Sequence, residues 1–167
     1  MRYSAKTSAC IFATINGPAT ILLMDLMAET GLKTMIGEVI MERKTPEYLI
    51  ESSAEQSAKD TIDWLDTTIV QYQNVKPILT PRFIPTCSDE LMRKLSAIQQ
   101  KYGLPMQSHL SENEGEIQWV KELCPNSEFY GDAYDQFGMF GGKYKTIMAH
   151  CVSSSDKERQ RMTDRGV

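Results

Sequence analysis

The chain has 167 residues, of which 41% are hydrophobic, enough to bury one core but short of the roughly 250 residues of a complete eight-stranded β/α barrel. Its net charge is −4 and its isoelectric point is near 5.2, so it offers no basic stripe and nucleic acid is excluded as its main partner. No apolar run reaches the about eighteen residues of a membrane span, and no signal peptide is evident. The four cysteines form no Cys-x-x-Cys pair. Together these features predict a cytoplasmic protein with reduced thiols.

Short β-type runs alternate with longer helical patterns from the beginning of the chain. Residues 8–14 predict a first strand, and a turn at residues 16–18 leads into an amphipathic helix over residues 19–30 that stops at Gly31. Residues 33–41, KTMIGEVIM, predict a second strand. This order of strand, helix and strand indicates a β/α repeat.

The repeat continues through the middle of the chain. Residues 45–47 supply a threonine cap, a first-turn proline and an acidic first turn, which predict a long helix to about Gln71. Residues 76–80 predict a third strand. After a loop, the Ser-Asp-Glu sequence at residues 88–90 predicts a helix that ends at Gly103.

The fourth predicted strand ends in one of the two histidines of the chain. It covers residues 104–109, and Ser111 with Glu114 three residues later has the spacing of a capping box for a helix through about Leu123. Glu114 and Glu116 are both explained by the favourable interaction of acidic side chains with the first turn of a helix. We therefore assign no function to them from the sequence.

The fifth predicted strand ends in the other histidine. It covers residues 146–150, and Ser155 with Glu158 repeats the capping-box spacing for a final helix. Five strand-then-helix units with nearly continuous apolar strands predict an α/β fold, in which a parallel sheet is covered by helices.

Two architectures fit five parallel β/α units. A doubly wound flavodoxin-like sheet closes at this length, whereas a β/α barrel would lack about three units. The turn over residues 14–20 has one glycine and one proline instead of a glycine-rich phosphate cradle, so a nucleotide site of the flavodoxin type is unsupported. Polar residues instead follow three later strands: Arg82, His109 with Glu112, and His150. Catalytic groups at strand ends are typical of a barrel, and from the residues alone both architectures stay open.

Several segments together resemble the guanine deaminases, zinc-dependent members of the amidohydrolase superfamily. The segments are ETGLKTMIGEVIMERKTPEYL, LTPRFIPTCSDELM, GLPMQSHLSEN, EIQWVKELCP and YDQFGMFGGKYKTIMAHCV. The similarity covers about Ser8 to Val167, and PRF, SHLSEN and AHCV in this order make it specific. The resemblance implies a partial (β/α)8 TIM-type barrel of the metal-dependent hydrolases, from about its second strand to the helix after its sixth. Residues 1–167 would then be one incomplete catalytic domain.

The resemblance also implies roles for five residues. His109 and His150 match two zinc-binding histidines of the family, and Glu112 matches its proton-shuttling glutamate. Arg82 matches the arginine that hydrogen-bonds the purine carbonyl, and Phe83 matches the aromatic residue that stacks on the purine. Without the resemblance, the histidines would more often be hydrogen-bonded core residues, Glu112 a first-turn acid, and Arg82 a surface cation.

These roles are chemically coherent for the hydrolysis of guanine to xanthine and ammonia. Neutral imidazoles bind Zn2+, and zinc-bound water supplies hydroxide near neutral pH, which can attack the purine carbon that carries the amino group. A neighbouring carboxylate can take the proton of that water and pass it to a ring nitrogen and then to the departing ammonia. An arginine on the purine oxygen can fix which ring carbon faces the metal.

Two features of the family have no counterpart in the chain. The His-x-His pair expected on the first barrel strand is missing, since His109 and His150 are the only histidines, and the aspartate expected after the eighth strand would lie beyond Val167. Two ligands are fewer than the three protein ligands of a usual catalytic zinc, so we expect the isolated chain to be inactive. The resemblance further implies a parent enzyme that is a homodimer.

Two other functions stay open at this point. The first is a related amidohydrolase that deaminates or dechlorinates another heterocycle. Arg82 and Phe83 count against it, because they favour a purine with a carbonyl as the substrate. The second is a flavodoxin-like binding module without metal chemistry, in which both histidines are structural. The two differ in whether the histidines converge on one metal-sized space.

Overall fold

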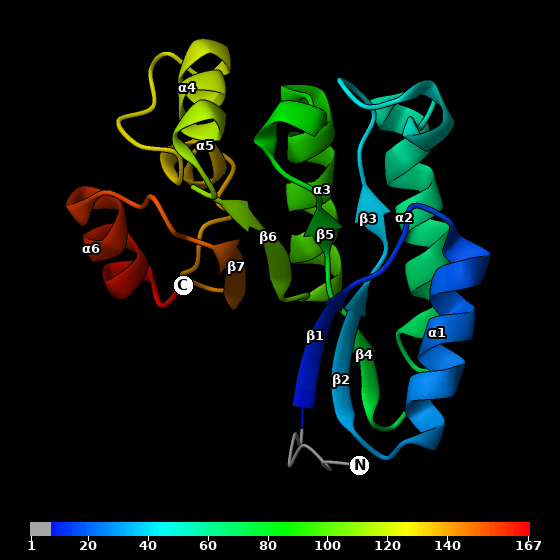
Figure 1. Ribbon diagram of the computed structural model, residues 1–167. Helices are drawn as coiled ribbons and strands as arrows, with labels where there is room; N and C mark the ends of the chain where they lie inside the picture. Colours follow the sequence, from blue (N-terminus) through cyan, green and yellow to red (C-terminus); the bar gives the residue numbers. More distant parts are fainter. Residues whose placement is uncertain (1–7) are drawn as a thin grey trace, which may run out of the picture.

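The structure is a computed structural model that describes residues 8–167 (Figure 1). The first seven residues, on which part of the signal-peptide prediction depends, lie outside the described residues. The first half of the described chain contains β1 (Ser8–Phe12), α1 (Gly17–Glu29), β2 (Lys33–Gly37), β3 (Val39–Ile40), the 3-10 helix η1 (Glu47–Leu49) and α2 (Ala54–Thr68).

The second half continues the alternation of strands and helices. It contains β4 (Val75–Pro77), β5 (Thr80–Pro81), the 3-10 helix η2 (Ile84–Thr86), α3 (Asp89–Tyr102), β6 (Met106–Leu110), α4 (Glu114–Leu123), α5 (Asp132–Asp135), β7 (Thr146–His150) and α6 (Asp156–Arg165). The α/β fold class predicted from the sequence is therefore confirmed, with a strand near each of the five predicted positions.

All strand pairs are parallel, and the strands stand in the order of the chain. β1 pairs with β2, β2 with β4, β3 with β5, and β6 with β7, while a bridge from Leu79 to Met106 joins the third strand position to the fourth. A flavodoxin-like sheet places its second strand outside its first. The observed order has no such reversal, so the flavodoxin-like alternative is wrong and the arrangement is that of a barrel segment.

Two of the predicted strands are each divided into two short pieces. The strand expected over residues 33–41 is interrupted at Glu38, and the one expected over residues 76–80 is interrupted at residues 78–79. A close approach at Gly37 accompanies the first interruption, because a Cβ atom there would lie only 1.7 Å from Thr80 Oγ1. The lack of a side chain at this glycine lets the neighbouring strand segment come near.

The helix predicted with Thr45 as its N-cap begins eight residues later than expected. Residues 47–49 form only the short η1, and the Thr45 hydroxyl caps nothing and has no hydrogen-bond partner. The start signal that operates is Ser53, which has extended backbone and whose hydroxyl accepts a hydrogen bond from the Gln56 amide at 3.1 Å. The prediction was wrong because two adjacent serine or threonine caps compete, and tertiary packing selected the second.

The capping box predicted at Ser111 is also wrong, by two residues. The N-cap of α4 is Asn113, whose side-chain oxygen accepts a hydrogen bond from the Glu116 amide at 2.9 Å. Ser111 has a left-handed backbone, with φ of 46°, and its hydroxyl donates to the Glu158 carboxylate at 2.7 Å instead. The other predicted box is present by half: Ser155 caps α6 by accepting from the Glu158 amide at 3.2 Å, but the Glu158 carboxylate binds Ser111 and Gly131 and does not bind the Ser155 amide.

The core lies between the strands and the inward faces of α2 and α3. Leu65 of α2, Leu91 and Leu95 of α3, and Ile36 and Met106 of the strands are fully buried. Helical periodicity explains this arrangement, because residues three or four apart lie on one face of a helix. Within residues 8–167 no helix is long and apolar enough to cross a bilayer, and all four cysteines are free thiols.

Candidate active site

The two histidines lie next to each other at the carboxyl ends of neighbouring strands. Parallel pairing of β6 with β7 places Leu110 opposite His150 and His109 opposite Ala149. The imidazole rings stack with their centroids 5.2 Å apart and their planes inclined by 25°. The expectation that both histidines reach one rim of the sheet thus agrees with their position.

The His109 ring is oriented by a backbone carbonyl. Its Nδ1 lies 2.7 Å from the Arg82 carbonyl oxygen, and the Phe12 ring packs against it with centroids 4.6 Å apart. A carbonyl oxygen can only accept, so Nδ1 carries the proton and Nε2 keeps a lone pair in the neutral ring. A hydrogen bond from one ring nitrogen to a carbonyl commonly orients metal-binding histidines, whose other nitrogen binds the metal.

Buried hydroxyl groups hold the strand that carries His109. The Tyr134 hydroxyl donates to the His109 carbonyl at 2.8 Å and lies 2.8 Å from Ser108 Oγ, and Ser108 donates to the Pro81 carbonyl at 2.7 Å. Burial raises the pKa of Tyr134, so its hydroxyl stays a donor. A network whose polar groups are satisfied in this way makes the backbone around His109 rigid.

His150 and Glu112 lie opposite each other in the more open part of the site. His150 Nε2 is 3.6 Å from Glu112 Oε2, and their side chains are 37% and 46% exposed. The backbone is left-handed at Ser111, His150 and Cys151, with φ of 46°, 71° and 56°. Non-glycine residues rarely adopt this conformation, which is found more often at functional sites.

The strained segments are tied to each other and to α6. The Cys151 amide donates to the Leu110 carbonyl at 2.8 Å, and the Ser153 amide donates to the Ser111 carbonyl at 2.9 Å. The Glu158 carboxylate, 1% exposed, accepts from the Ser111 hydroxyl and from the Gly131 amide, both at 2.7 Å. These bonds keep the ends of β6 and β7 together where the two histidines stand.

A small pocket beside the histidines contains the other predicted site residues. Its volume is about 160 Å³, and it is lined by Arg82, Phe83, His109, Glu112 and Glu116. The Arg82 guanidinium lies 5.0 Å from the centre of the Phe83 ring and pairs with no carboxylate among residues 8–167. An unpaired arginine next to an aromatic face can bind a flat molecule that carries an acceptor oxygen.

Glu116 is the lining residue that the sequence reasoning missed. It is 9% exposed, and burial raises the pKa of its carboxyl group above the ordinary value. A signal for it exists in the sequence, because Glu116 follows Glu112 by four residues and such residues share one side of a helix. The sequence analysis explained Glu116 only by the preference of acidic side chains for the first turn of a helix.

The donor set fits part of a zinc site. Two imidazoles lie close together with a carboxylate near one of them, and neutral imidazole is a natural zinc ligand. Within residues 8–167 there is no group of three or more histidine, cysteine, aspartate or glutamate side chains that could hold a metal ion. Among the described residues, the His109 and His150 imidazoles are therefore the candidate ligands for such an ion.

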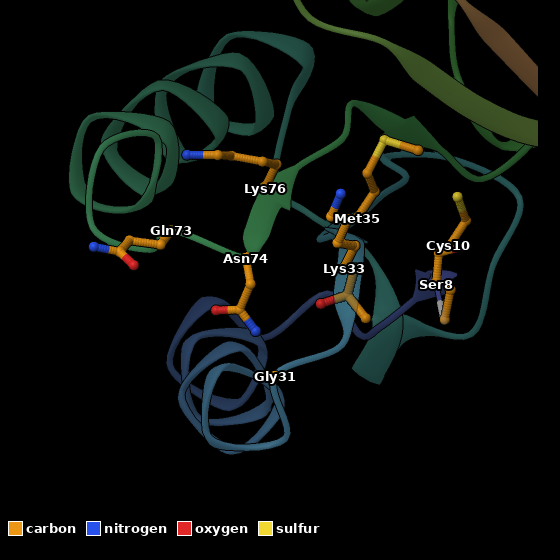
Figure 2. Close-up of a pocket in the computed structure, with 10 residues that line it drawn as sticks. Ser8, Cys10, Gly31, Lys33, Met35, Gln73, Asn74 and Lys76 are labelled. Atoms are coloured by element: carbon orange, nitrogen blue, oxygen red, sulfur yellow. The ribbon is translucent and has the colours of Figure 1, made fainter. Parts of the chain in front are cut away.

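A larger hollow, with a volume of about 560 Å³, lies at the opposite ends of the strands and is shown in Figure 2. Its lining includes Cys10, Lys33, Asn74 and Lys76, which come from the beginnings of β1, β2 and β4 or precede them. None of the predicted site residues lines it. In parallel α/β folds the chemistry occurs at the carboxyl ends of strands, so the smaller pocket at the histidines is the better candidate.

The chain is similar to known enzymes over almost its whole length. Residues 6–166 match the sequence model of the Amidohydrolase family. Guanine deaminase of Dictyostelium discoideum is 41% identical over 153 residues, which cover 91% of this chain and 33% of that protein. The crystal structure of guanine deaminase from C. acetobutylicum with bound guanine has a TM-score of 0.91 and 42% identity, covering 96% of this chain and 38% of that chain.

A more distant solved structure shares the fold alone. An adenosine deaminase from Xanthomonas campestris with bound zinc has a TM-score of 0.74 at 16% identity. The TIM-barrel type of fold predicted from the sequence is confirmed by these neighbours, of which this chain forms a segment. The chain spans about a third of the length of the curated relatives it matches.

Proposed function

This chain belongs to the amidohydrolase family, and from that premise we propose that it is part of an enzyme that hydrolyses guanine to xanthine and ammonia with a bound zinc ion. The observation that carries the proposal is the meeting of His109, His150 and Glu112 at one rim, beside the pocket formed by Arg82 and Phe83. We also propose that residues 1–167 form one incomplete catalytic barrel of a cytoplasmic, homodimeric enzyme.

The two histidines are the residues that would hold the metal. His109 presents Nε2, because its Nδ1 donates to the Arg82 carbonyl, and His150 stacks against it from the next strand. Bound zinc lowers the pKa of a coordinated water to near neutrality and so supplies the attacking hydroxide. The orientation of the His109 ring is set by its hydrogen bond to the Arg82 carbonyl, in the segment after β5.

Glu112 is suited to moving protons at this site. It follows β6 directly, it is 46% exposed, and its carboxylate lies 3.6 Å from His150 Nε2. A carboxylate in this place can accept a proton from water and deliver it to a ring nitrogen and then to ammonia, so that one water replaces one amino group. No proton remains on Glu112 at the end of the cycle.

Arg82 and Phe83 would orient the purine. The Arg82 guanidinium donates to an oxygen, which a carbonyl of guanine supplies, and Phe83 offers an aromatic surface that Trp119 supports edge-on with centroids 5.9 Å apart. An arginine donor favours a heterocycle with a carbonyl over one that has only amino groups. For this reason guanine is preferred to the other aminated or chlorinated heterocycles.

Two measurements test the proposal, one on this chain and one on a chimera that contains it. The first determines bound zinc by mass spectrometry in the 167-residue chain. The second uses a chimera in which this chain replaces the matching segment of the C. acetobutylicum enzyme, which restores the remaining barrel, and follows ammonia release from guanine. We expect weak zinc binding by the chain and guanine deamination by the chimera.

Matched variants of the chimera give the roles of the residues. His109→Ala and His150→Ala should each lose zinc, whereas Glu112→Gln should keep zinc and lose about two or more orders of magnitude in kcat. Glu114→Ala is the control, because Glu114 is an exposed acid of the same helix. A folded chimera that holds zinc but deaminates only other heterocycles would refute the substrate, and one that holds no zinc would refute the enzyme proposal.

A further inference from the structure

Glu116 contributes a second carboxylate to the pocket, beside the one to which we assign proton transfer. It lies four residues after Glu112, in the first turn of α4, and the Asn113 cap accepts a hydrogen bond from its amide at 2.9 Å. Both glutamates line the same pocket, but Glu112 is exposed and Glu116 is 9% exposed. The two carboxylates therefore differ in environment although they line one pocket.

The Glu116 carboxyl group has no hydrogen-bond partner in the described part of the protein. Its Oε1 is buried without a partner, and the hydroxyl of the neighbouring Tyr130 is also buried without one. Burying a polar group without a partner costs free energy, and native proteins usually avoid it. An unsatisfied acceptor at the wall of a pocket is therefore explained most simply by a ligand that donates to it.

The rest of the pocket shows what kind of ligand this is. Arg82 brings several N–H donors, Glu116 brings only acceptor oxygens when ionised, and Phe83 brings a flat apolar surface. A donor and an acceptor beside an aromatic ring are complementary to a planar heterocycle with a carbonyl and a ring N–H. Guanine has both groups, whereas a heterocycle whose ring nitrogens are all unprotonated offers Glu116 no ring N–H.

We propose that Glu116 is a specificity-determining residue that accepts a hydrogen bond from a ring N–H of the purine, while Arg82 donates to the purine carbonyl. This inference rests on the function proposed above and deepens it, because it selects guanine by two complementary contacts. It assigns Glu116 a role in binding, and it leaves the transfer of protons to Glu112. A charge-assisted contact of this kind contributes about tenfold to hundredfold in affinity.

The test compares substrates and variants in the chimera described above. In Glu116→Ala we expect KM for guanine to rise about tenfold or more with a much smaller change in kcat, and bound zinc to stay the same. The matched control is Glu114→Ala, an exposed acid two residues earlier, which should change KM less than twofold. Guanines methylated at N1, N7 or N9 then identify the N–H that is recognised.

One of these methylated guanines should be a poor substrate for the unchanged chimera, because its methyl group takes the place of the hydrogen that Glu116 accepts. Glu116→Ala should lose this discrimination, since the smaller side chain leaves room for the methyl group. A residue needed only for folding would lower stability and activity toward all substrates alike. Loss of discrimination is thus a readout that a structural role does not produce.

A second variant tests whether Glu116 acts only as a partner of Tyr130. In Tyr130→Phe we expect KM for guanine to be unchanged, whereas equal effects of Tyr130→Phe and Glu116→Ala on KM would refute the proposal. An active chimera whose KM and substrate discrimination do not respond to Glu116→Ala refutes this inference alone. Failure of both the chimera and the 167-residue chain to bind guanine, measured by quenching of tryptophan fluorescence, refutes the proposed function and this inference with it.

Discussion

Glu38 is a buried acid without a hydrogen-bond partner, placed where β2 ends and β3 begins. It is 7% exposed and faces Glu51 and Asp60 across a pocket between α1 and α2 that Trp64 also lines. Burial, and then repulsion by Glu51 and Asp60, raises the pKa of Glu38 from 4.5 to about 8. The folded protein therefore keeps a proton on Glu38 at a pH where the unfolded chain has lost it.

We predict from this pKa that stability falls as the pH rises. Below pH 4.5 both states hold the proton and the contribution of Glu38 is complete, whereas between pH 4.5 and about 8 only the folded state holds it. The free energy of unfolding should decrease through this window by about 2 to 4 kcal/mol and then level off. Glu38→Gln removes the titrating group, so its stability relative to the unchanged chain should increase with pH.

Urea unfolding at several pH values measures this difference. Glu47→Gln is the control, since Glu47 is exposed in η1 and has no comparable burial. The difference in the free energy of unfolding between Glu38→Gln and the unchanged chain should therefore vary with pH. If this difference is the same from acidic to alkaline pH, Glu38 is ionised in the folded protein.

Single residues were predictable where a strand ends in a chemically distinctive side chain. His109 and His150 could be placed at one rim because parallel strands end on the same side of a sheet, and their rings are indeed neighbours. Glu116 could not be identified in this way, because its first-turn position already had a sufficient explanation. Only the burial of its carboxylate in the pocket distinguishes it from Glu114, which is exposed.

At the scale of elements, the start of α2 gives a direct comparison of two caps. Ser53 accepts from the Gln56 amide and begins the helix, whereas the Thr45 hydroxyl has no partner. We predict that Ser53→Ala lowers the free energy of unfolding by about 1 kcal/mol and that Thr45→Ala changes it by less than about 0.5 kcal/mol. Thermal or urea unfolding measures both, and a larger effect at Thr45 would restore the helix start predicted from the sequence.

Helix α6 connects the folding of the last element to the geometry of the site. Its Glu158 carboxylate binds the Ser111 hydroxyl and the Gly131 amide, each at 2.7 Å, and is almost completely buried. The sequence indicated Glu158 only as part of a capping box, because a glutamate three residues after Ser155 has that spacing. The use of its side chain by a loop 47 residues earlier depends on tertiary structure and leaves no periodic pattern.

We predict that Glu158→Ala is one of the most destabilising single changes in the chain. Two charge-assisted hydrogen bonds are lost and two donors stay buried, which should cost about 3 kcal/mol or more. Lys157→Ala is the matched control, because its ion pair with Glu128 lies at the surface and such pairs contribute little. Equal unfolding midpoints for the two variants would mean that Ser111 and Gly131 find other partners.

At the scale of the whole molecule, the sequence indicated the elements but left their order across the sheet open. Five β/α units are compatible with a flavodoxin-like order and with a barrel-like order, since both have apolar parallel strands and similar helices. The decision depends on which strands pair, and here β2 lies between β1 and β4. Pairing over such distances is a property of the assembled core, and only the family resemblance of the sequence motifs pointed to it.

The same strand order predicts how the protein behaves at high concentration. In the described part of the chain, β1 pairs only with β2, and β7 pairs only with β6, so each has one edge of unpaired backbone groups. Such edges tend to pair with strands of other molecules. We therefore expect the isolated chain to self-associate as its concentration rises, which sedimentation velocity detects as a shift to larger species.

A charge placed on one of these edges should oppose the association. Ile147 lies in the middle of β7 and is 37% exposed, so Ile147→Lys adds a positive charge where an incoming strand would pair. Val152→Lys is the matched control, because Val152 is 77% exposed in the turn after β7 and carries no strand pairing. Ile147→Lys should shift the chain toward the monomer at concentrations where the control still associates. If both variants associate equally, the contact between molecules does not involve the edge of β7, and the edge of β1 is the next to test by the same substitution at Cys10.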